Sequence, residues 1–196
     1  MHYVFDCDDV LLDWQQGFSR FMSARGMDLA PEGPSQWDMA DWIGCSPDAA
    51  LSWVSRFNNS ESFAYLNAMP GAYEAVWRLR DKGATIHVLT SCGEHKQRDR
   101  ASNLNLAFGR NGSNPFSSLH CLPLGEPKLA ALLDMKDDLA PDPYARFVFV
   151  EDRFENADSA TFQGILSYCL RRSHNRKDED AHFTDVHWID NLNEVQ

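Results

Sequence analysis

The sequence contains no basic stretch, no long apolar run and no closely spaced pair of cysteines. Lys and Arg number 18 against 29 Asp and Glu, which gives a formal net charge of −11. So acidic a chain repels nucleic-acid backbones and anionic lipid surfaces, and we expect no nucleic acid polymer and no membrane as a partner. No apolar segment approaches the roughly 20 residues that cross a bilayer, and the first residues lack the regions of a signal peptide. These absences predict a cytoplasmic protein.

The cysteines do not form the pattern of a disulfide framework. There are five of them, an odd number, and no two are separated by two residues. Such usage is typical of reduced thiols in a cytosolic protein. A zinc site built from Cys92, His95 and Cys121 is a minor alternative.

The composition is that of an ordinary globular protein. The chain has 196 residues, of which 43% are hydrophobic and 24% charged, enough to bury a core in one domain, or in one domain with a modest insertion. Because the overall field repels anions, an anionic substrate needs local help from a metal, a lysine or backbone N–H groups. The sequence leaves the oligomeric state open.

Short apolar runs alternate with segments of helical spacing. Alternation of this kind predicts an α/β protein with a doubly wound, Rossmann-like, mostly parallel sheet and helices on both sides. Helices are expected at 70–83, where Gly83 suits the residue after the helix end, and at 127–139. Strands are expected at 3–5, 85–89, 119–122, 147–150 and 165–170.

The long stretch after the first strand predicts a small helical cap. Residues 11–26 follow the helical period, and Ser46, Pro47 and Asp48 resemble the start of a further helix. We therefore expect residues 1–12 and 69–196 to form the α/β core and 13–68 a cap over the carboxyl end of the sheet. Most cap aromatics would fill its core. Trp37 and Trp42, in a polar loop-like stretch, are candidates for substrate contact.

Two carboxylates follow the first predicted strand. Asp6 and Asp8 come directly after the apolar run 3–5, and ligands of open α/β sheets bind outside the carboxyl ends of the strands. Two neighbouring carboxylates repel each other unless a cation joins them, and Mg²⁺ favours such oxygen ligands. Because a chain this acidic produces an Asp-x-Asp pattern often by chance, the motif gains its weight from position and from further signals downstream.

Three of those signals fall at the ends of later elements. Thr90 and Ser91 follow the strand at 85–89 and offer a hydroxyl and backbone N–H groups to a phosphate oxygen. Lys128 lies in the first turn of a helix, where a cation opposes the helix dipole and so indicates an anion or carboxylate to be met. Glu151 and Asp152 end the strongest apolar run, and Asp152 can complete a metal site with Asp6.

Together these motifs resemble those of the haloacid dehalogenase superfamily of phosphohydrolases, in order and over nearly the whole chain. Asp6 to Val10 is similar to its first motif, Thr90 to its second, Lys128 to its third, and Glu151 and Asp152 with Asn156 to its fourth. The resemblance implies that Asp6 is the nucleophile, that Asp8 is the general acid and base, and that Thr90 and Lys128 bind phosphate oxygens.

The resemblance also implies Mg²⁺, held by Asp6, the backbone carbonyl of Asp8 and Asp152. One departure is Glu151, which stands where the family commonly has Asp or Gly. It leaves Asp152 as the direct ligand and Glu151 as a residue behind it. An acid at Asp8 favours a phosphatase or mutase over the dehalogenating members.

The expected activity is Mg²⁺-dependent hydrolysis of a small phosphorylated metabolite through an aspartyl-phosphate. The cap is loosely similar to that of the deoxyribonucleotidases, which makes a nucleoside monophosphate the leading substrate. A phosphotransferase or phosphomutase, or a catalytically silent phosphate-binding module, remains as an alternative.

The charged residues after the second and fourth motifs are expected to be solvated. Arg98 and Arg100 most simply suit the solvated face of a helix, and whether Lys96, Arg98 or Arg100 also meets substrate is left open by the sequence. The stretch 171–180 is expected to be a solvated loop. The histidines His174, His182 and His187 are expected at the surface rather than as ligands.

Overall fold

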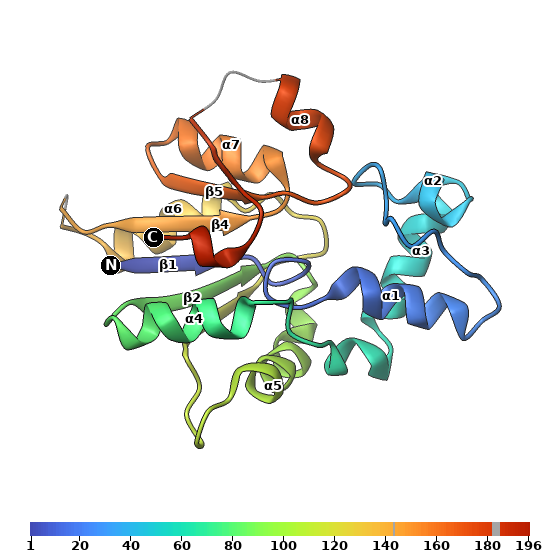
Figure 1. Cartoon of the computed structure of the whole chain (residues 1–196), viewed down its shortest axis with the longest axis horizontal. Helices are drawn as coiled ribbons and strands as arrows, with labels where there is room; N and C mark the ends of the chain where they lie inside the picture. Colours follow the sequence, from blue (N-terminus) through green and yellow to red (C-terminus); the bar gives the residue numbers. More distant parts are fainter. Residues whose placement is uncertain (143, 182–184) are drawn as a thin grey trace.

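The computed structural model describes residues 1–142, 144–181 and 185–196, apart from the side chains of 180 and 181, and its centre is an all-parallel sheet (Figure 1). The strand order is β3-β2-β1-β4-β5-β6. The chain therefore starts in the middle of the sheet and winds outward in both directions. The strands are β1 (His2–Phe5), β2 (Thr85–Thr90), β3 (Phe116–Cys121), β4 (Phe147–Glu151), β5 (Leu166–Leu170) and β6 (His187–Ile189).

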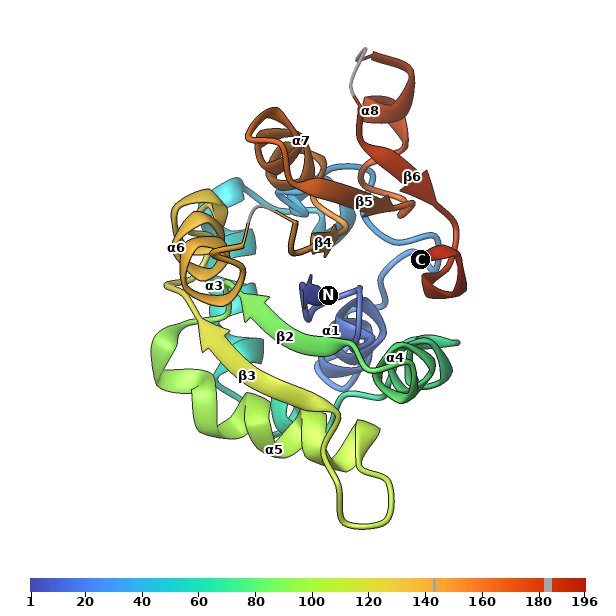
Figure 2. The ribbon, with the colours of Figure 1, turned by 90° about the vertical axis from the view of Figure 1, so that its left-hand side faces the viewer.

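Helices cover both faces of this sheet, as the alternating pattern predicts. One face packs on α4 (Ala72–Asp81), α5 (Gln97–Phe108) and the 3₁₀ turn η3 (Leu192–Glu194). The other face packs on α6 (Leu129–Leu139) and α7 (Phe154–Phe162) (Figure 2). Neighbouring side chains of β1 point to opposite sides, because Phe5 joins the first core and Val4 the second. The predicted doubly wound α/β architecture is confirmed.

The segment between β1 and α4 is helical and lies beyond the carboxyl ends of the strands (Figure 1). Ser46 begins α3 as predicted, since its side chain accepts a hydrogen bond from the backbone N–H of Ala49. The elements of this segment are α1 (Trp14–Ser23), α2 (Ala40–Ile43), α3 (Pro47–Asn58) and the 3₁₀ turn η1 (Glu61–Tyr65).

The two passages of the chain into and out of this segment run side by side. Leu12 and Ala68 form an antiparallel bridge, and the backbone N–H of Asp13 donates to the carbonyl of Asn67 at 2.9 Å. The predicted cap boundaries at 13 and 68 coincide with this paired neck. The division into core and cap domains stays a prediction, and we use "cap" for residues 13–68.

Some elements differ from the expectation. The strand β6 was not predicted, because three residues give too short a pattern. The strand β3 begins at Phe116, three residues earlier than expected. The stretch 171–180 is not simply a solvated loop, since it contains most of α8 (Arg176–Ala181). Among the described residues, no helix is both long and apolar enough to cross a membrane.

Candidate active site

The first motif lies at the point where the winding of the sheet reverses. Because β2 and β4 flank β1, the residues after these three strands meet at one edge of the sheet, where doubly wound proteins bind their ligands. A cavity of about 270 Å³ opens there, between this edge and the cap. Its walls come from both, and include Asp6, Asp8, Asp9, Thr90, Ser91, Lys128, Asp152, Arg153, Asn156 and His174 of the core and Trp14, Trp37, Met39, Leu51 and Val54 of the cap.

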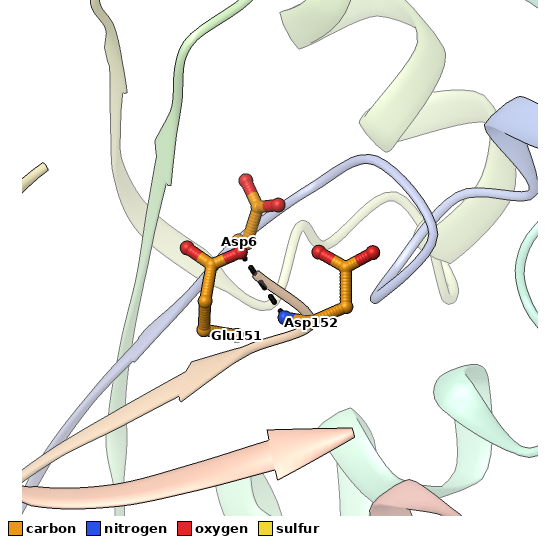
Figure 3. Close-up of side chains that lie close together, drawn as sticks. All are labelled: Asp6, Glu151 and Asp152. Carbon is orange, nitrogen blue, oxygen red and sulfur yellow. Dashed lines mark hydrogen bonds between the residues drawn. The ribbon is translucent and has the colours of Figure 1, made fainter. Parts of the chain in front are cut away.

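Three carboxylates and a lysine form the floor of the cavity. Asp6, Glu151 and Asp152 each place a carboxylate oxygen within 4.8 Å of the others, and all three are buried (Figure 3). Lys128, at the residue before α6, is also buried, and its Nζ lies 2.5 Å from Asp6 Oδ1 and 2.7 Å from Glu151 Oε2. A lysine at the start of α6 is unfavourable for the helix dipole, and the ion pairs with these two acids explain its position. We call Asp6, Glu151 and Asp152 the acid cluster.

Glu151 is held by hydrogen bonds on both of its oxygens. Oε1 accepts from the backbone N–H groups of Asp152 and Arg153, each at 3.1 Å. Oε2 accepts from Lys128 and from Asn156 Nδ2 at 3.2 Å. With these partners Glu151 anchors the lysine and the turn after β4.

Only one of the two carboxylate oxygens of Asp152 has a partner in the described part of the chain. Its Oδ2 lies 3.3 Å from His174 Nε2, whereas its Oδ1 is buried and forms no hydrogen bond within the described part of the chain. Burial disfavours the charged form, but the hydrogen bond and charge of His174 outweigh it and lower the pKa of Asp152. A buried, ionised oxygen without a partner is costly, so this atom fits a cation in the acid cluster.

The charges of the floor do not balance without such a cation. Three carboxylates face one lysine, and a protonated His174 beside Asp152 adds one further positive charge, which still leaves a negative charge when all three acids are ionised. Burial and the neighbouring Glu151 raise the pKa of Asp6 well above its usual range, and Lys128 only partly offsets them. Surplus negative charge among hard oxygen ligands matches Mg²⁺ in sign and chemistry.

Asp8 forms an ion pair with a different cation, Arg100. Arg100 of α5 is fully buried, and its Nη2 donates to Asp8 Oδ1 at 2.5 Å. The guanidinium also lies over the ring of Phe63, 4.0 Å from its centroid, in the 3₁₀ turn of the cap. Burial raises the pKa of Asp8 and Arg100 opposes that rise. The pair keeps the carboxyl of Asp8 in the wall of the cavity.

Asp9 turns the chain out of the site. It has a left-handed φ of 57°, which Asp tolerates better than most residues, and its Oδ1 accepts from the backbone N–H of Gln15 at 2.9 Å. Burial and nearby Asp152 raise the pKa of Asp9 to about 8. A protonated Asp9 adds no further negative charge to the crowded edge near neutral pH.

The predicted phosphate-binding residues follow β2. They therefore lie on one side of Asp6, whereas Glu151 and Asp152, at the end of β4, lie on the other. Thr90 is the last residue of β2 and is almost fully buried, and both Thr90 and Ser91 line the cavity. The hydroxyl of Ser91 donates to the carbonyl of Glu126 at 2.8 Å and so ties this turn to the segment that carries Lys128. The structure thus brings the second and third motifs together at one wall.

The two cap tryptophans differ in position. Trp37 lines the cavity, is 43% exposed, and lies edge-on to His174 with ring centroids 5.2 Å apart. Trp42 does not line it. Its ring packs on Phe18, its Nε1 donates to the carbonyl of Ala30 at 2.7 Å, and it belongs to the cap core. Of the two candidates for substrate contact, only Trp37 is in place for it.

Comparison with solved structures relates this arrangement to known proteins. A haloacid dehalogenase-like family hydrolase from Streptococcus pneumoniae matches with a TM-score of 0.68 and 14% identity, over 99% of this chain and 95% of that one. A haloacid dehalogenase-like hydrolase from Bacteroides fragilis matches with a TM-score of 0.66 and 16% identity, over 100% of this chain and 99% of that one. The protein has the haloacid dehalogenase-like fold.

Other proteins of the haloacid dehalogenase-like fold also match. A protein assigned as a beta-phosphoglucomutase from Thermotoga maritima has a TM-score of 0.60 and 18% identity, over 99% of this chain and 95% of that one. Dehalogenases are among the matching chains as well. No family model and no curated protein matches the sequence. At these identities the comparison establishes the fold alone.

Two residues of the candidate site were missed in the sequence. Arg100 was expected on a solvated helix face, yet it is buried against Asp8, and only Arg98 is exposed. Its place four residues before Leu104 and eight before Phe108, both buried, was the available signal. His174 was expected at the surface but is buried at Asp152. His187 is exposed as expected, and His182 lies outside the described residues.

Other expectations concern residues away from the acid cluster. Lys96 is mostly buried and pairs with Asp99 at 3.3 Å, and it does not line the cavity. Among the residues that the structure describes, the acid cluster is the one group with metal-ligating geometry, and the zinc alternative of Cys92, His95 and Cys121 does not form such a group. All five cysteines are unpaired as disulfides.

Proposed function

We propose that the protein is a Mg²⁺-dependent phosphomonoester hydrolase that forms an aspartyl-phosphate on Asp6. The observation that carries the proposal is the acid cluster, whose surplus charge and unpartnered Asp152 Oδ1 face the same cavity as Asp8 and Lys128. Such a floor is suited to a cation and a phosphoryl group together.

Asp6, Asp152 and the backbone carbonyl of Asp8 would hold the metal. Bound Mg²⁺ would supply positive charge against the oxygens of the transferring phosphoryl group. Lys128, 2.5 Å from Asp6 Oδ1, orients the nucleophile and contributes a further positive charge beside the phosphoryl oxygens. Thr90 and Ser91 offer hydroxyl and backbone N–H groups at the facing wall.

In the first step a carboxylate oxygen of Asp6 attacks phosphorus. The bond between phosphorus and the ester oxygen breaks, its electron pair stays on that oxygen, and the carboxyl of Asp8 gives it a proton. The raised pKa of Asp8 suits a group that must carry a proton before this step. The bond to Arg100 then stabilises the carboxylate that remains.

In the second step water attacks the phosphorus of the aspartyl-phosphate. The carboxylate of Asp8 takes the proton of that water, the bond between phosphorus and Asp6 breaks, and inorganic phosphate leaves. Both carboxylates return to their starting states. One pair of acids, Asp6 and Asp8, therefore serves both halves of the reaction.

Dehalogenation is the less favoured reading of the same fold. A halide leaves as a weakly basic anion and needs no proton, so a dehalogenase would have no use for Asp8 and Arg100 in the cavity wall. Transfer of the phosphoryl group to a sugar hydroxyl in place of water uses the same residues, and it is an outcome of the test below.

The test is phosphate release from a panel of nucleoside monophosphates, sugar phosphates and an aryl phosphate, with Mg²⁺ or EDTA. We expect turnover that needs Mg²⁺ and falls by about 10⁴-fold or more in Asp6→Asn, because the amide is not a nucleophile. The matched control is Asp138→Asn on the exposed side of α6, which should not change the rate. Turnover in EDTA, or an active Asp6→Asn variant, would contradict the mechanism.

For the substrate we propose a small phosphomonoester with a flat organic group, and a nucleoside monophosphate first. Trp37 lines the cavity, and about 43% of its surface is free to meet such a group. We expect Trp37→Ala to raise KM about 10-fold, or about 1.4 kcal/mol, within the range for stacking of a base on an aromatic ring.

The matched control for Trp37 is Trp42. Because Trp42 packs in the cap core, Trp42→Ala should lower the melting temperature and leave KM nearly unchanged. An unchanged KM in a folded Trp37→Ala variant would exclude this ring from substrate recognition.

A further inference from the structure

The segment that follows β5 contacts Asp9 and Asp152 at the edge of the sheet that holds the acid cluster. Arg172 donates from Nε and Nη2 to the backbone carbonyl of Asp9, at 2.8 and 2.6 Å. Asn175 is almost fully buried and donates from Nδ2 to the backbone carbonyl of Asp152 at 2.6 Å. These bonds fix the main chain of two residues at the site. They leave the side chain of Asp152 to be oriented by another group.

His174 is that group. It is 5% exposed, and its Nε2 lies 3.3 Å from both Oδ2 and the backbone carbonyl of Asp152. Its Nδ1 lies 3.4 Å from Nε2 of Gln15, at the start of α1. Both groups of Asp152 that face Nε2 are hydrogen-bond acceptors, so Nε2 carries a proton that is directed at Asp152.

This contact decides which carboxylate oxygen faces the acid cluster. With Oδ2 held by the imidazole, Oδ1 is the oxygen that lies buried without a hydrogen bond in the described part of the chain. Loss of the contact would free the side chain to rotate and to share its charge with other donors. Groups that orient a ligating carboxylate commonly set metal affinity as strongly as some ligands do.

We infer that His174 is a positioning residue for the metal centre, which orients Asp152 so that Oδ1 is presented to a divalent cation. The inference rests on the proposed function, because it requires a cation in the acid cluster. It assigns a role to a loop that the charge pattern of the sequence places in solvent.

The imidazole is itself held from the cap. Gln15 of α1 meets Nδ1, and the ring of Trp37 packs edge-on at 5.2 Å. The guanidinium of Arg153 lies over the ring of Trp37, 5.1 Å from its centroid. Because Gln15 and Trp37 both belong to the cap, the orientation of His174, and hence of Asp152, depends on the position of the cap.

The experiment compares two amide variants that differ in which imidazole nitrogen they imitate. The Nε2 of Gln in His174→Gln reaches the position of the imidazole Nε2 and keeps the bond to Asp152. The amide of Asn in His174→Asn reaches only the position of Nδ1 and loses it. Affinity for Mn²⁺ alone is measured from the free-ion signal in electron paramagnetic resonance, without substrate, for the whole protein.

We expect His174→Asn to bind Mn²⁺ about 10- to 100-fold more weakly than the native protein, and His174→Gln within about threefold of it. The control His187→Gln, at an exposed histidine of β6, should bind as the native protein does. His174→Ala should also bind weakly and regain affinity when imidazole is added, which keeps the inference testable if the Asn variant does not fold.

Two outcomes overturn the inference, and they differ. If native protein binds Mn²⁺ and folded His174→Asn binds it equally well, His174 has no positioning role and the proposed function stands. If native protein binds no Mn²⁺, and Asp152→Asn behaves identically, the metal site and the proposed function fail together with it.

Discussion

Two clusters of polar side chains on the central strands meet burial in opposite ways. At the carboxyl edge, Asp6, Glu151 and Asp152 surround Lys128 and remain in excess of it. Within the sheet, His2 Nδ1 lies 3.2 Å from His87 Nε2, and His87 Nδ1 lies 2.8 Å from Ser118 Oγ. His120 Nε2 reaches the same hydroxyl at 2.9 Å, so that β1, β2 and β3 share a chain of four side chains.

His87, the buried member of this histidine chain, meets burial by remaining neutral. Burial, with His2 and His120 nearby, lowers the pKa of His87 to about 4, and neutral imidazoles satisfy one another through hydrogen bonds. The acid cluster keeps charge that it cannot neutralise internally. The difference teaches that a buried polar group is not by itself a functional signal, whereas an uncompensated buried charge facing a cavity is one.

The largest effect is expected when Lys128, the lysine that pairs with the acid cluster, is replaced. Lys128→Met leaves three buried carboxylates without a partner, and we expect the free energy of unfolding in EDTA to fall by about 3–5 kcal/mol. Part of the loss should return with Mg²⁺, since the ion meets the same charges. Urea unfolding with and without Mg²⁺ measures both effects.

The matched control for Lys128 is Lys136, two turns along the same helix. Lys136→Met should lower the free energy of unfolding by less than about 1 kcal/mol, because that residue lies in the last turn of α6, where its charge interacts with the helix dipole. Equal losses for the two variants in EDTA would show that the acid cluster carries no unbalanced charge.

The second test adds Mg²⁺, the cation that the acid cluster is proposed to bind, to the native protein. Mg²⁺ at 100 times its Kd should stabilise the folded state by about 2.7 kcal/mol, which raises the melting temperature by about 5–10 °C for a chain of this size. Scanning calorimetry in EDTA and in Mg²⁺ measures the shift. Asp152→Asn should abolish it, and a shift that persists in that variant would place the ion elsewhere.

The histidine chain should respond to protons and not to metal. Because the pKa of His87 is lowered to about 4 from an unfolded value of about 6.5, the unfolded state binds its proton first as pH falls. Stability from His87 is therefore present above pH 6.5 and is lost toward pH 4. Between pH 7 and 5 we expect a loss of about 2 kcal/mol from this residue.

The measurement is urea unfolding at both pH values for the native protein and His87→Gln. The variant should lose about 2 kcal/mol less than the native protein on acidification, and His187→Gln on the exposed strand should lose as much as the native protein does. Parallel pH profiles for native protein and His87→Gln would mean that the histidine chain accepts a proton in the fold.

The predictable part of the site consists of residues next to strong apolar runs. Asp6 and Asp152 follow β1 and β4, whose side chains alternate between two buried faces, and such strands are visible in the sequence. Once the strands are parallel, their ends must meet at one edge. Lys128 was found through a local conflict with the helix dipole, which needs no knowledge of the fold.

The residues that were missed reach the site from segments without a clear period. Arg100 lies in a helix whose charged neighbours obscure its buried side, and it meets Asp8 only because α5 packs beneath the cap. His174 comes from a charged stretch of the chain that folds back over β4. Trp42 was a reasonable candidate for substrate contact by composition, but in the folded cap its side chain packs against the hydrophobic core.

The sequence by itself determined most of the core strands and helices and the acids and lysine at their ends, because hydrophobic period and local charge are properties of neighbouring residues. The tertiary structure alone decided which cation meets Asp8, which donor orients Asp152 and which tryptophan faces the cavity. These contacts join residues as far apart as Asp8 and Arg100 or Asp152 and His174, and no local pattern encodes them. Their energies arise only when burial removes water from both partners at once.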